Sequence, residues 1–370
     1  MKLNDVTLRE GDQMPGREYT AEEKLACARR LDDLGVAFIQ PGFPVTGEKD
    51  RRVISELAGT TDASVVALAR ALDGDVDAAL EANADVVEVF VTASASQREH
   101  LLGASMDEMC SMLGGAVDRV RDGGATPHVT LADAFRTPRA ELVEILEHVP
   151  RVPMVTLADS VGAVTPPTVE AFLAGLASDV DFSRLGVHFH DDLGCGTANA
   201  LVAYDSGIGK ADVSVAAIGE RAGNTALEEL VAACVVDFED DLGLAVDELV
   251  PTCRAILSEL GEEYDGRKAI LGEKTTEHES GIHVAAMLQE PSTLEPFDPA
   301  TFGGQRRLLF GAQTGASATR QLLERAGIDP DEEVIETLQD RLTERGPLEL
   351  DDALELARAV AETAGGENSS

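Results

Sequence analysis

His188 and His190 are the residues whose types and spacing are most suited to chemistry. They stand at positions i and i+2 of the strand-like run LGVHFH, so an extended backbone directs both imidazoles to one side. Two imidazoles on one face are half of a metal site, and the carboxylate of Glu10 in TLREGDQ can extend it. An isolated HxH is often two hydrogen-bonded histidines, but Glu10 and Asn224 in GERAGN favour a divalent cation, either Mg²⁺, Mn²⁺ or Zn²⁺.

Further polar residues follow the predicted strands, where loops would carry them to one face. They are Arg9, Glu10, Asp12 and Gln13 after the first, Asp133 and Arg136 after the fifth, Asp159 and Ser160 after the sixth, and Glu220, Arg221 and Asn224 after the eighth. We expect Arg9 to bind a carboxylate or enolate oxygen rather than form a surface ion pair with Glu10. The remaining candidates are Asp159 for catalysis and Gln13, Arg136 and Ser160 for substrate binding, although Arg136 could also cap a helix.

The elements that must position these residues alternate between short apolar runs and amphipathic runs. Strand and helix patterns pair eight times within roughly the first 240 residues, with expected strands that include 5–8, 64–70, 126–132 and 211–217. This alternation predicts a (β/α)₈ barrel. A doubly wound open sheet would alternate similarly, but no GxGxxG follows the first strand. We predict a catalytic barrel over 1–245, a linker subdomain over 246–311, and a small helical subdomain over 312–370 that ends in the polar tail GGENSS.

Composition excludes several classes of function. Asp and Glu total 68 against 30 Lys and Arg, and the net charge of -38 disfavours binding to nucleic acid or anionic membranes. The acidic excess suits a protein of a high-salt cytoplasm, where counterions screen self-repulsion. Five cysteines without a CxxC pair indicate neither a disulfide framework nor a zinc ribbon. The opening MKLNDVTLRE has no apolar signal segment, so we expect a cytoplasmic protein without a membrane span.

These motifs together resemble the isopropylmalate, homocitrate and citramalate synthase family. The resemblance is carried by DVTLREGDQ, IQPGFP, ADAFRTP, LADSVGAVTP, HFHDDLGCGTANA, GERAGNTALEELV and HESGIHVAAMLQEPSTLEPFDP, which span nearly the whole chain. It implies a metal-dependent condensation of acetyl-CoA with a 2-oxo acid. The metal polarises the keto group, a base removes a methyl proton from acetyl-CoA, and hydrolysis of the thioester releases CoA.

The resemblance also implies roles for individual residues. Glu10, His188 and His190 would ligate the metal, with Asn224 as a further ligand or supporting partner. Arg9 would stabilise the substrate oxygens. His283 would assist proton transfer at the barrel of a partner subunit, which implies a homodimer with exchanged C-terminal regions.

The sequence departs from the family at four places. The family often has Glu at Gln40 and at Ala132, Tyr at Leu294, and a GKHSG-like run in place of GAQTG. REGDQ, GCGTANA and HESGIHV favour a homocitrate synthase, in which Arg136 would pair with the distal carboxylate of 2-oxoglutarate. ALARA and GERAGN favour an isopropylmalate or citramalate synthase. An HMG-CoA-lyase-like or aldolase-like carbon-carbon lyase and a non-catalytic paralogue that binds oxo acids are the remaining alternatives.

Overall fold

The computed structural model describes residues 1–367, with the side chains of 364–367 excepted. The chain divides into two compact units, Met1–Tyr264 and Asp265–Ser370. The functional division predicted at residues 245 and 311 stays a prediction.

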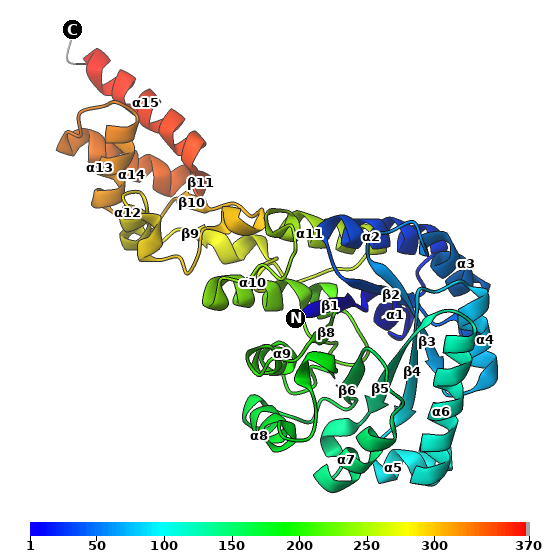
Figure 1. The fold of residues 1–370 in the computed structure, drawn as a ribbon. Coiled ribbons are helices and arrows are strands. Elements are labelled where there is room, and N and C mark those ends of the chain that lie inside the picture. Colours follow the sequence, from blue (N-terminus) through cyan, green and yellow to red (C-terminus); the bar gives the residue numbers. More distant parts are fainter. Residues whose placement is uncertain (368–370) are drawn as a thin grey trace. The chain divides into compact units, whose positions relative to one another are not determined.

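The first unit is built on a closed barrel of eight parallel strands. Figure 1 shows strands of this barrel with helices around them. The strands are β1 (Lys2–Asp5), β2 (Phe38–Gly42), β3 (Ser64–Arg70), β4 (Val86–Thr92), β5 (Thr126–Ala132), β6 (Val155–Asp159), β7 (Leu185–Phe189) and β8 (Lys210–Val213). They pair in sequence order, and β1 closes the barrel against β8 with Asn4 opposite Asp212. The predicted barrel is therefore confirmed.

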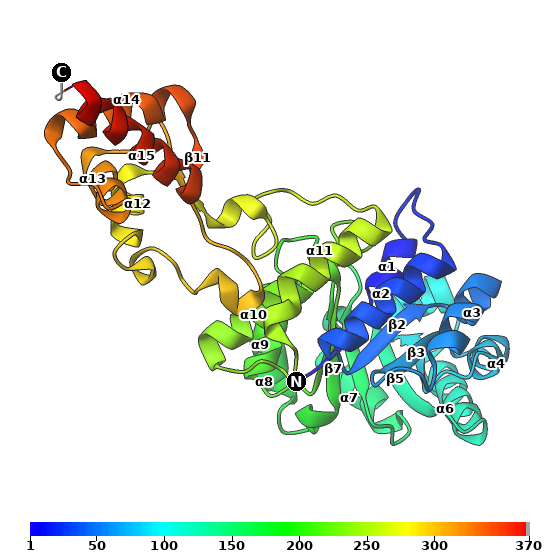
Figure 2. The same ribbon diagram turned by 90° about the horizontal axis from the view of Figure 1, so that it is seen from above.

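Helices surround the strands, and two of these helices begin at a capping box. The unit contains α1 (Thr7–Asp12), α2 (Ala21–Leu34), α3 (Glu48–Leu57), α4 (Asp73–Glu81), α5 (Ala95–Gln97), α6 (Met106–Asp122), α7 (Arg139–His148), α8 (Pro166–Leu176), α9 (Gly196–Asp205), α10 (Leu227–Phe238) and α11 (Leu249–Leu260). Thr20 with Glu23 caps α2, and Ser105 with Glu108 caps α6, so each pair satisfies backbone N–H groups of the first turn. After the barrel, α11 returns to pack beside α2 (Figure 2).

The two faces of the strands differ in chemistry. Side chains that face the surrounding helices are aliphatic and almost fully buried, as at Val87, Val129 and Leu157. The neighbouring positions face the barrel axis, and several of these side chains are polar. For example, Glu88 on β4 accepts a hydrogen bond from Lys210 on β8, on the opposite side of the barrel. The interior of the barrel is thus a buried polar layer inside an apolar shell.

The first predicted strand is wrong in its position. Residues 5–8 were expected to be extended, but β1 ends at Asp5 and α1 begins at Thr7. Asp5 accepts hydrogen bonds from the backbone N and the Oγ1 of Thr7, and this local turn ends the strand. Arg9 and Glu10 therefore stand on a helical turn at the rim of the barrel.

Asp5 makes the stability of the barrel depend on pH. Burial raises the pKa of its carboxyl group to about 7. The folded chain then binds this proton more tightly than the unfolded chain. The contribution of Asp5 to the free energy of unfolding is therefore greatest below about pH 4 and is lost as the pH rises to about 7. Relative to Asp5→Asn, the wild type should lose up to about 1.4 kcal/mol of unfolding free energy for each pH unit in this window. Urea unfolding at several pH values in concentrated salt measures it, and parallel pH profiles would contradict it.

The eighth strand is shorter than predicted. The run 211–217 was expected to be extended, but β8 ends at Val213, and Ala216 and Ala217 have φ of 53° and 63°. An alanine in this left-handed region is strained, and such a backbone cannot continue the strand.

The second unit is a small mixed domain with its own core. It contains α12 (Gly281–Met287), α13 (Ala316–Arg325), α14 (Glu332–Arg345) and α15 (Leu350–Glu367), with a sheet of β11 (Leu348–Glu349), β10 (Arg307–Phe310) and β9 (Glu277–His278). Phe310, Leu322 and Leu338 belong to its buried cluster. The predicted polar tail begins within α15, and its residues 368–370 lie outside the described residues. Within the described part of the chain, no helix is both long and apolar enough to cross a membrane.

Candidate metal centre

Glu10, His188 and His190 form a compact buried cluster at the barrel mouth. His188 lies on β7, His190 follows it, and Glu10 approaches from α1. The His188 Nε2 atom is 3.4 Å from Nε2 of His190 and 3.6 Å from Oε1 of Glu10. One ligand atom of each residue lies within 4.8 Å of the others, so the structure brings together the three residues predicted to share a cation.

Asn224 adjoins this cluster through the loop between β8 and α10. Its Nδ2 atom is 3.3 Å from His188 Nε2, and its backbone forms an isolated bridge with His190. A Cβ atom at Gly219 would lie 2.0 Å from Asn224 Oδ1, so only glycine leaves room for this amide. The local backbone is therefore shaped to hold Asn224 against the imidazoles.

The chemistry of the cluster fits a divalent cation. Glu10 Oε2 and Asn224 Oδ1 are buried and have no hydrogen-bond partner among the described residues. Burial alone would raise the pKa of Glu10, but Arg9 and the two imidazoles hold it below its usual value. Burial, assisted by His188, lowers the pKa of His190 to about 4. At neutral pH the cluster thus offers a carboxylate and a neutral imidazole, the forms that bind metals.

A ring of buried polar contacts supports the cluster. Asp212 Oδ2 lies 3.2 Å from His188 Nδ1, Lys210 bridges Asp212 and Glu88, and Gln40 joins Glu88 to Arg9. Arg9 closes the ring by its contact with Glu10. The ring contains two cationic and three anionic side chains, a sum of -1 that a cation at the cluster would offset.

Glu88, Lys210 and Asp212 were not among the residues predicted from the sequence. The available signal was the alternation of KAD, since charged residues two apart on a strand share a face. In a barrel that shared face can be the interior.

A cavity opens beside Arg9. It has a volume of about 420 Å³, and Gln13, Phe43 and Lys49 are among its lining residues. Gln13 is exposed, and its Oε1 atom lies 3.4 Å from Arg9 Nη1. This size is sufficient for a small organic acid.

Arg136 and Ser160 lie in a separate polar group. Arg136 forms two hydrogen bonds with the Asp133 carboxylate, at 2.7 and 2.8 Å. The backbone N of Asp133 donates to Ser160 Oγ. Asp159 is buried, and its carboxylate accepts from the amides of Ala163 and Val164, so it shapes the loop after β6.

His283 belongs to the second unit. It lies on α12, where its side chain is exposed. Its predicted part in proton transfer stays a prediction.

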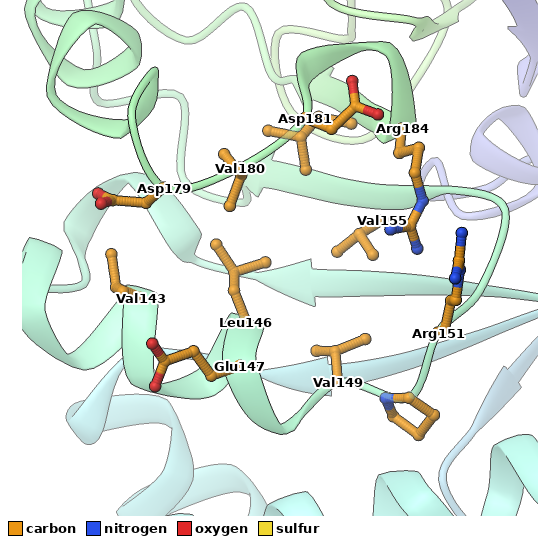
Figure 3. Close-up of a pocket in the computed structure, with 12 residues that line it drawn as sticks. Val143, Leu146, Glu147, Val149, Arg151, Val155, Asp179, Val180, Asp181 and Arg184 are labelled. Atoms are coloured by element: carbon orange, nitrogen blue, oxygen red, sulfur yellow. The ribbon is translucent and has the colours of Figure 1, made fainter.

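A second cavity lies at the opposite end of the strands. It has a volume of about 560 Å³ and is bounded by α7 and by the connection from α8 to β7 (Figure 3). Val143, Leu146 and Val180 are among its apolar lining residues, and Arg151 and Asp181 are among the charged ones. None of the predicted site residues lines it, which agrees with the location of active sites at the carboxyl ends of barrel strands.

Comparison with known proteins shows the relationships of both units. Residues 1–252 match the HMGL-like family, and residues 270–346 match the homocitrate synthase post-HMGL domain-like family. The chain is 38% identical to homocitrate synthase AksA of Methanopyrus kandleri, over 92% of this chain and 87% of that protein. It is 35% identical to a protein of the same organism named probable 2-isopropylmalate synthase, over 94% of this chain and 70% of that protein.

Solved structures share the barrel. An HMG-CoA lyase of Bacillus subtilis superposes with a TM-score of 0.63 at 21% identity, covering 70% of this chain and 94% of the lyase. At this identity the likeness concerns the fold. The family matches and the extent of the sequence identity show that the chain belongs to the HMGL-like family, in the group that includes the homocitrate and 2-isopropylmalate synthases.

Proposed function

We propose that the protein catalyses a divalent-metal-dependent condensation of acetyl-CoA with a 2-oxo acid. The methyl carbon of acetyl-CoA loses a proton and bonds to the keto carbon, whose oxygen gains a proton. Water then cleaves the thioester, giving a 2-hydroxy acid with one additional carboxyl group and free CoA. The convergence of Glu10, His188 and His190 beside Arg9 carries this proposal.

The side chains of the cluster have distinct tasks in this reaction. Glu10, His188 and His190 hold the cation, and Asn224 lies close enough to add an oxygen or to support His188. When bound, a divalent cation polarises the keto group of the oxo acid. Arg9 lines the adjacent cavity, and its guanidinium stabilises the negative charge that develops on substrate oxygens.

The second unit supplies the remaining task. In the proposed homodimer, His283 of the partner subunit assists the proton transfers at the barrel mouth. Its exposed position on α12 leaves the imidazole accessible to another chain.

We propose 2-oxoglutarate as the first substrate to examine. The Methanopyrus kandleri relative is named homocitrate synthase AksA, and REGDQ and HESGIHV favour the same branch of the family. Arg136 already makes two hydrogen bonds with Asp133, so a distal carboxylate would have to share this guanidinium.

Release of free CoA thiol tests the function. Purified protein with Mn²⁺, acetyl-CoA and concentrated KCl should release thiol when 2-oxoglutarate, 2-oxoisovalerate or pyruvate is added in turn, with the largest rate for 2-oxoglutarate. A chelator should abolish the release. Thiol release that needs no 2-oxo acid would reject the condensation, and oxo acid binding without release would identify a non-catalytic paralogue.

A further inference from the structure

Lys210 lies at the centre of the polar layer inside the barrel. Its side chain is 1% exposed, and its Nζ is 2.8 Å from Glu88 Oε1 and 3.1 Å from Asp212 Oδ1. Both carboxylates are buried as well. A buried ammonium group is costly unless it is paired, so these contacts fix Lys210 and both acids in position.

One set of contacts leads from Lys210 through Asp212 to His188, and we call it the first branch. It determines which nitrogen of His188 carries a proton. Asp212 Oδ1 accepts from Lys210 and from Asn4 Nδ2 at 2.9 Å, so Oδ2 is the atom left for His188 Nδ1. A carboxylate only accepts hydrogen bonds, so His188 must carry its proton on Nδ1. The lone pair of Nε2 is then directed at the cluster with Glu10 and His190.

A second set of contacts, the second branch, leads from Lys210 through Glu88 and Gln40 to Arg9. It determines the orientation of Arg9 in a similar way. Glu88 Oε1 accepts from Lys210, and also from Thr130 at 3.0 Å. Glu88 Oε2 accepts from Gln40 Nε2 at 2.6 Å, so the Gln40 amide must turn its oxygen to Arg9. Arg9 Nε donates to that oxygen at 2.7 Å.

We propose that Lys210 is a positioning residue for both halves of the active site: through Asp212 it sets the tautomer of His188, and through Glu88 and Gln40 it sets the direction of Arg9. This inference rests on the proposed function for its catalytic meaning. The two branches are separable, because one ends at a proposed metal ligand and the other at Arg9, which lines the cavity with Gln13 and Lys49.

Asp212→Asn tests the first branch. The amide oxygen must stay with the donors of Lys210 and Asn4, so the NH₂ group faces His188 Nδ1 and moves the imidazole proton to Nε2. Affinity for Mn²⁺ should fall by roughly 10- to 100-fold, the usual effect of losing a partner of a metal ligand. In apoprotein with ¹⁵N-labelled histidine, the His188 signals should change tautomer.

Lys24→Met is a control for the histidine spectrum. Lys24 is as buried as Lys210 and is also held between two carboxylates, those of Asp12 and Asp50, but it lies outside the ring. Its replacement should leave the His188 tautomer unchanged. A wild-type tautomer and wild-type Mn²⁺ affinity in Asp212→Asn would overturn the first branch of the inference.

Glu88→Gln tests the second branch, and a double variant provides a rescue. The new amide turns its NH₂ group to Gln40, whose own amide must then reverse and face Arg9 with a donor. The value of kcat should fall roughly 10-fold or more, a part of the 10²–10³-fold that loss of a charge-stabilising donor costs. Affinity for Mn²⁺ should stay within about threefold.

The double variant Glu88→Gln with Gln40→Glu returns an acceptor to Arg9 at the same total charge. It should recover most of kcat and the ¹⁵N signal of Arg9 Nε, whereas a merely structural ion pair predicts equal loss in both variants. The tautomer and the Arg9 signal need no turnover. If the wild type releases no thiol, the proposed function fails while these two spectra still decide the inference.

Discussion

His190→Gln is expected to abolish tight metal binding and, with it, turnover. Loss of a supporting partner costs about 10- to 100-fold in metal affinity, and loss of a ligand itself should exceed about 100-fold. The substitution removes one of two imidazoles from the cluster but leaves the contacts of His188 with Asp212 in place. Calorimetric titration with Mn²⁺ measures the affinity, and thiol release measures the turnover.

His128→Gln is the matched control for this experiment. His128 lies on β5, is buried like His190, and its pKa is also lowered to about 4 by burial, assisted by Lys210. It does not belong to the cluster of Glu10, His188 and His190 that is proposed to bind the metal. Equal loss of Mn²⁺ affinity in the two variants would mean that the barrel interior, and not this cluster, determines binding.

Arg9→Met is expected to reduce kcat by about 10²–10³-fold while Mn²⁺ binds at least as tightly as before. In the proposed reaction the guanidinium stabilises charge on the substrate. It also lies against Glu10, so its removal leaves the cluster more negative. A cation then gains electrostatic attraction although the reaction loses its charge-stabilising donor. Steady-state thiol release and Mn²⁺ titration separate the two effects.

Arg119→Met controls for the loss of an arginine as such. Arg119 pairs with Asp77 on the outer surface of the barrel, where both side chains are more than two-fifths exposed. Its replacement should leave kcat and Mn²⁺ affinity unchanged. Weakened Mn²⁺ binding in Arg9→Met would instead assign Arg9 to the support of the cation.

The strands of the barrel could be predicted where both faces are buried and β-branched residues are frequent. The ranges 64–70 and 126–132 agree with β3 and β5. The first strand was misplaced because Asp5 ends it through hydrogen bonds with Thr7, and such a turn leaves the apolar pattern unchanged. Helix α14 was not predicted, since half of the residues in its sequence EEVIETLQDRLTER are charged and it buries only a narrow apolar stripe.

The cluster of Glu10, His188 and His190 was predictable because the HxH spacing fixes two of its members on one face. The ring of buried polar contacts that supports this cluster was not predictable. Glu88 stands in the apolar run VVEVFV, and a strand that is buried on both sides gives no periodicity from which to assign the face of one acid. The partners of Glu88 are also remote in sequence, with Lys210 separated from it by 122 positions.

The ionic middle of the barrel limits how this sequence can diverge. An aliphatic interior tolerates gradual exchange of one residue for another of similar volume. Here a change at Lys210 leaves two buried carboxylates without the cation that they share, whereas a change at Glu88 or Asp212 leaves Lys210 with one carboxylate. Lineages that replace Lys210 are therefore expected to exchange Glu88 and Asp212 with it, and these substitutions should covary across strands that are distant in the sequence.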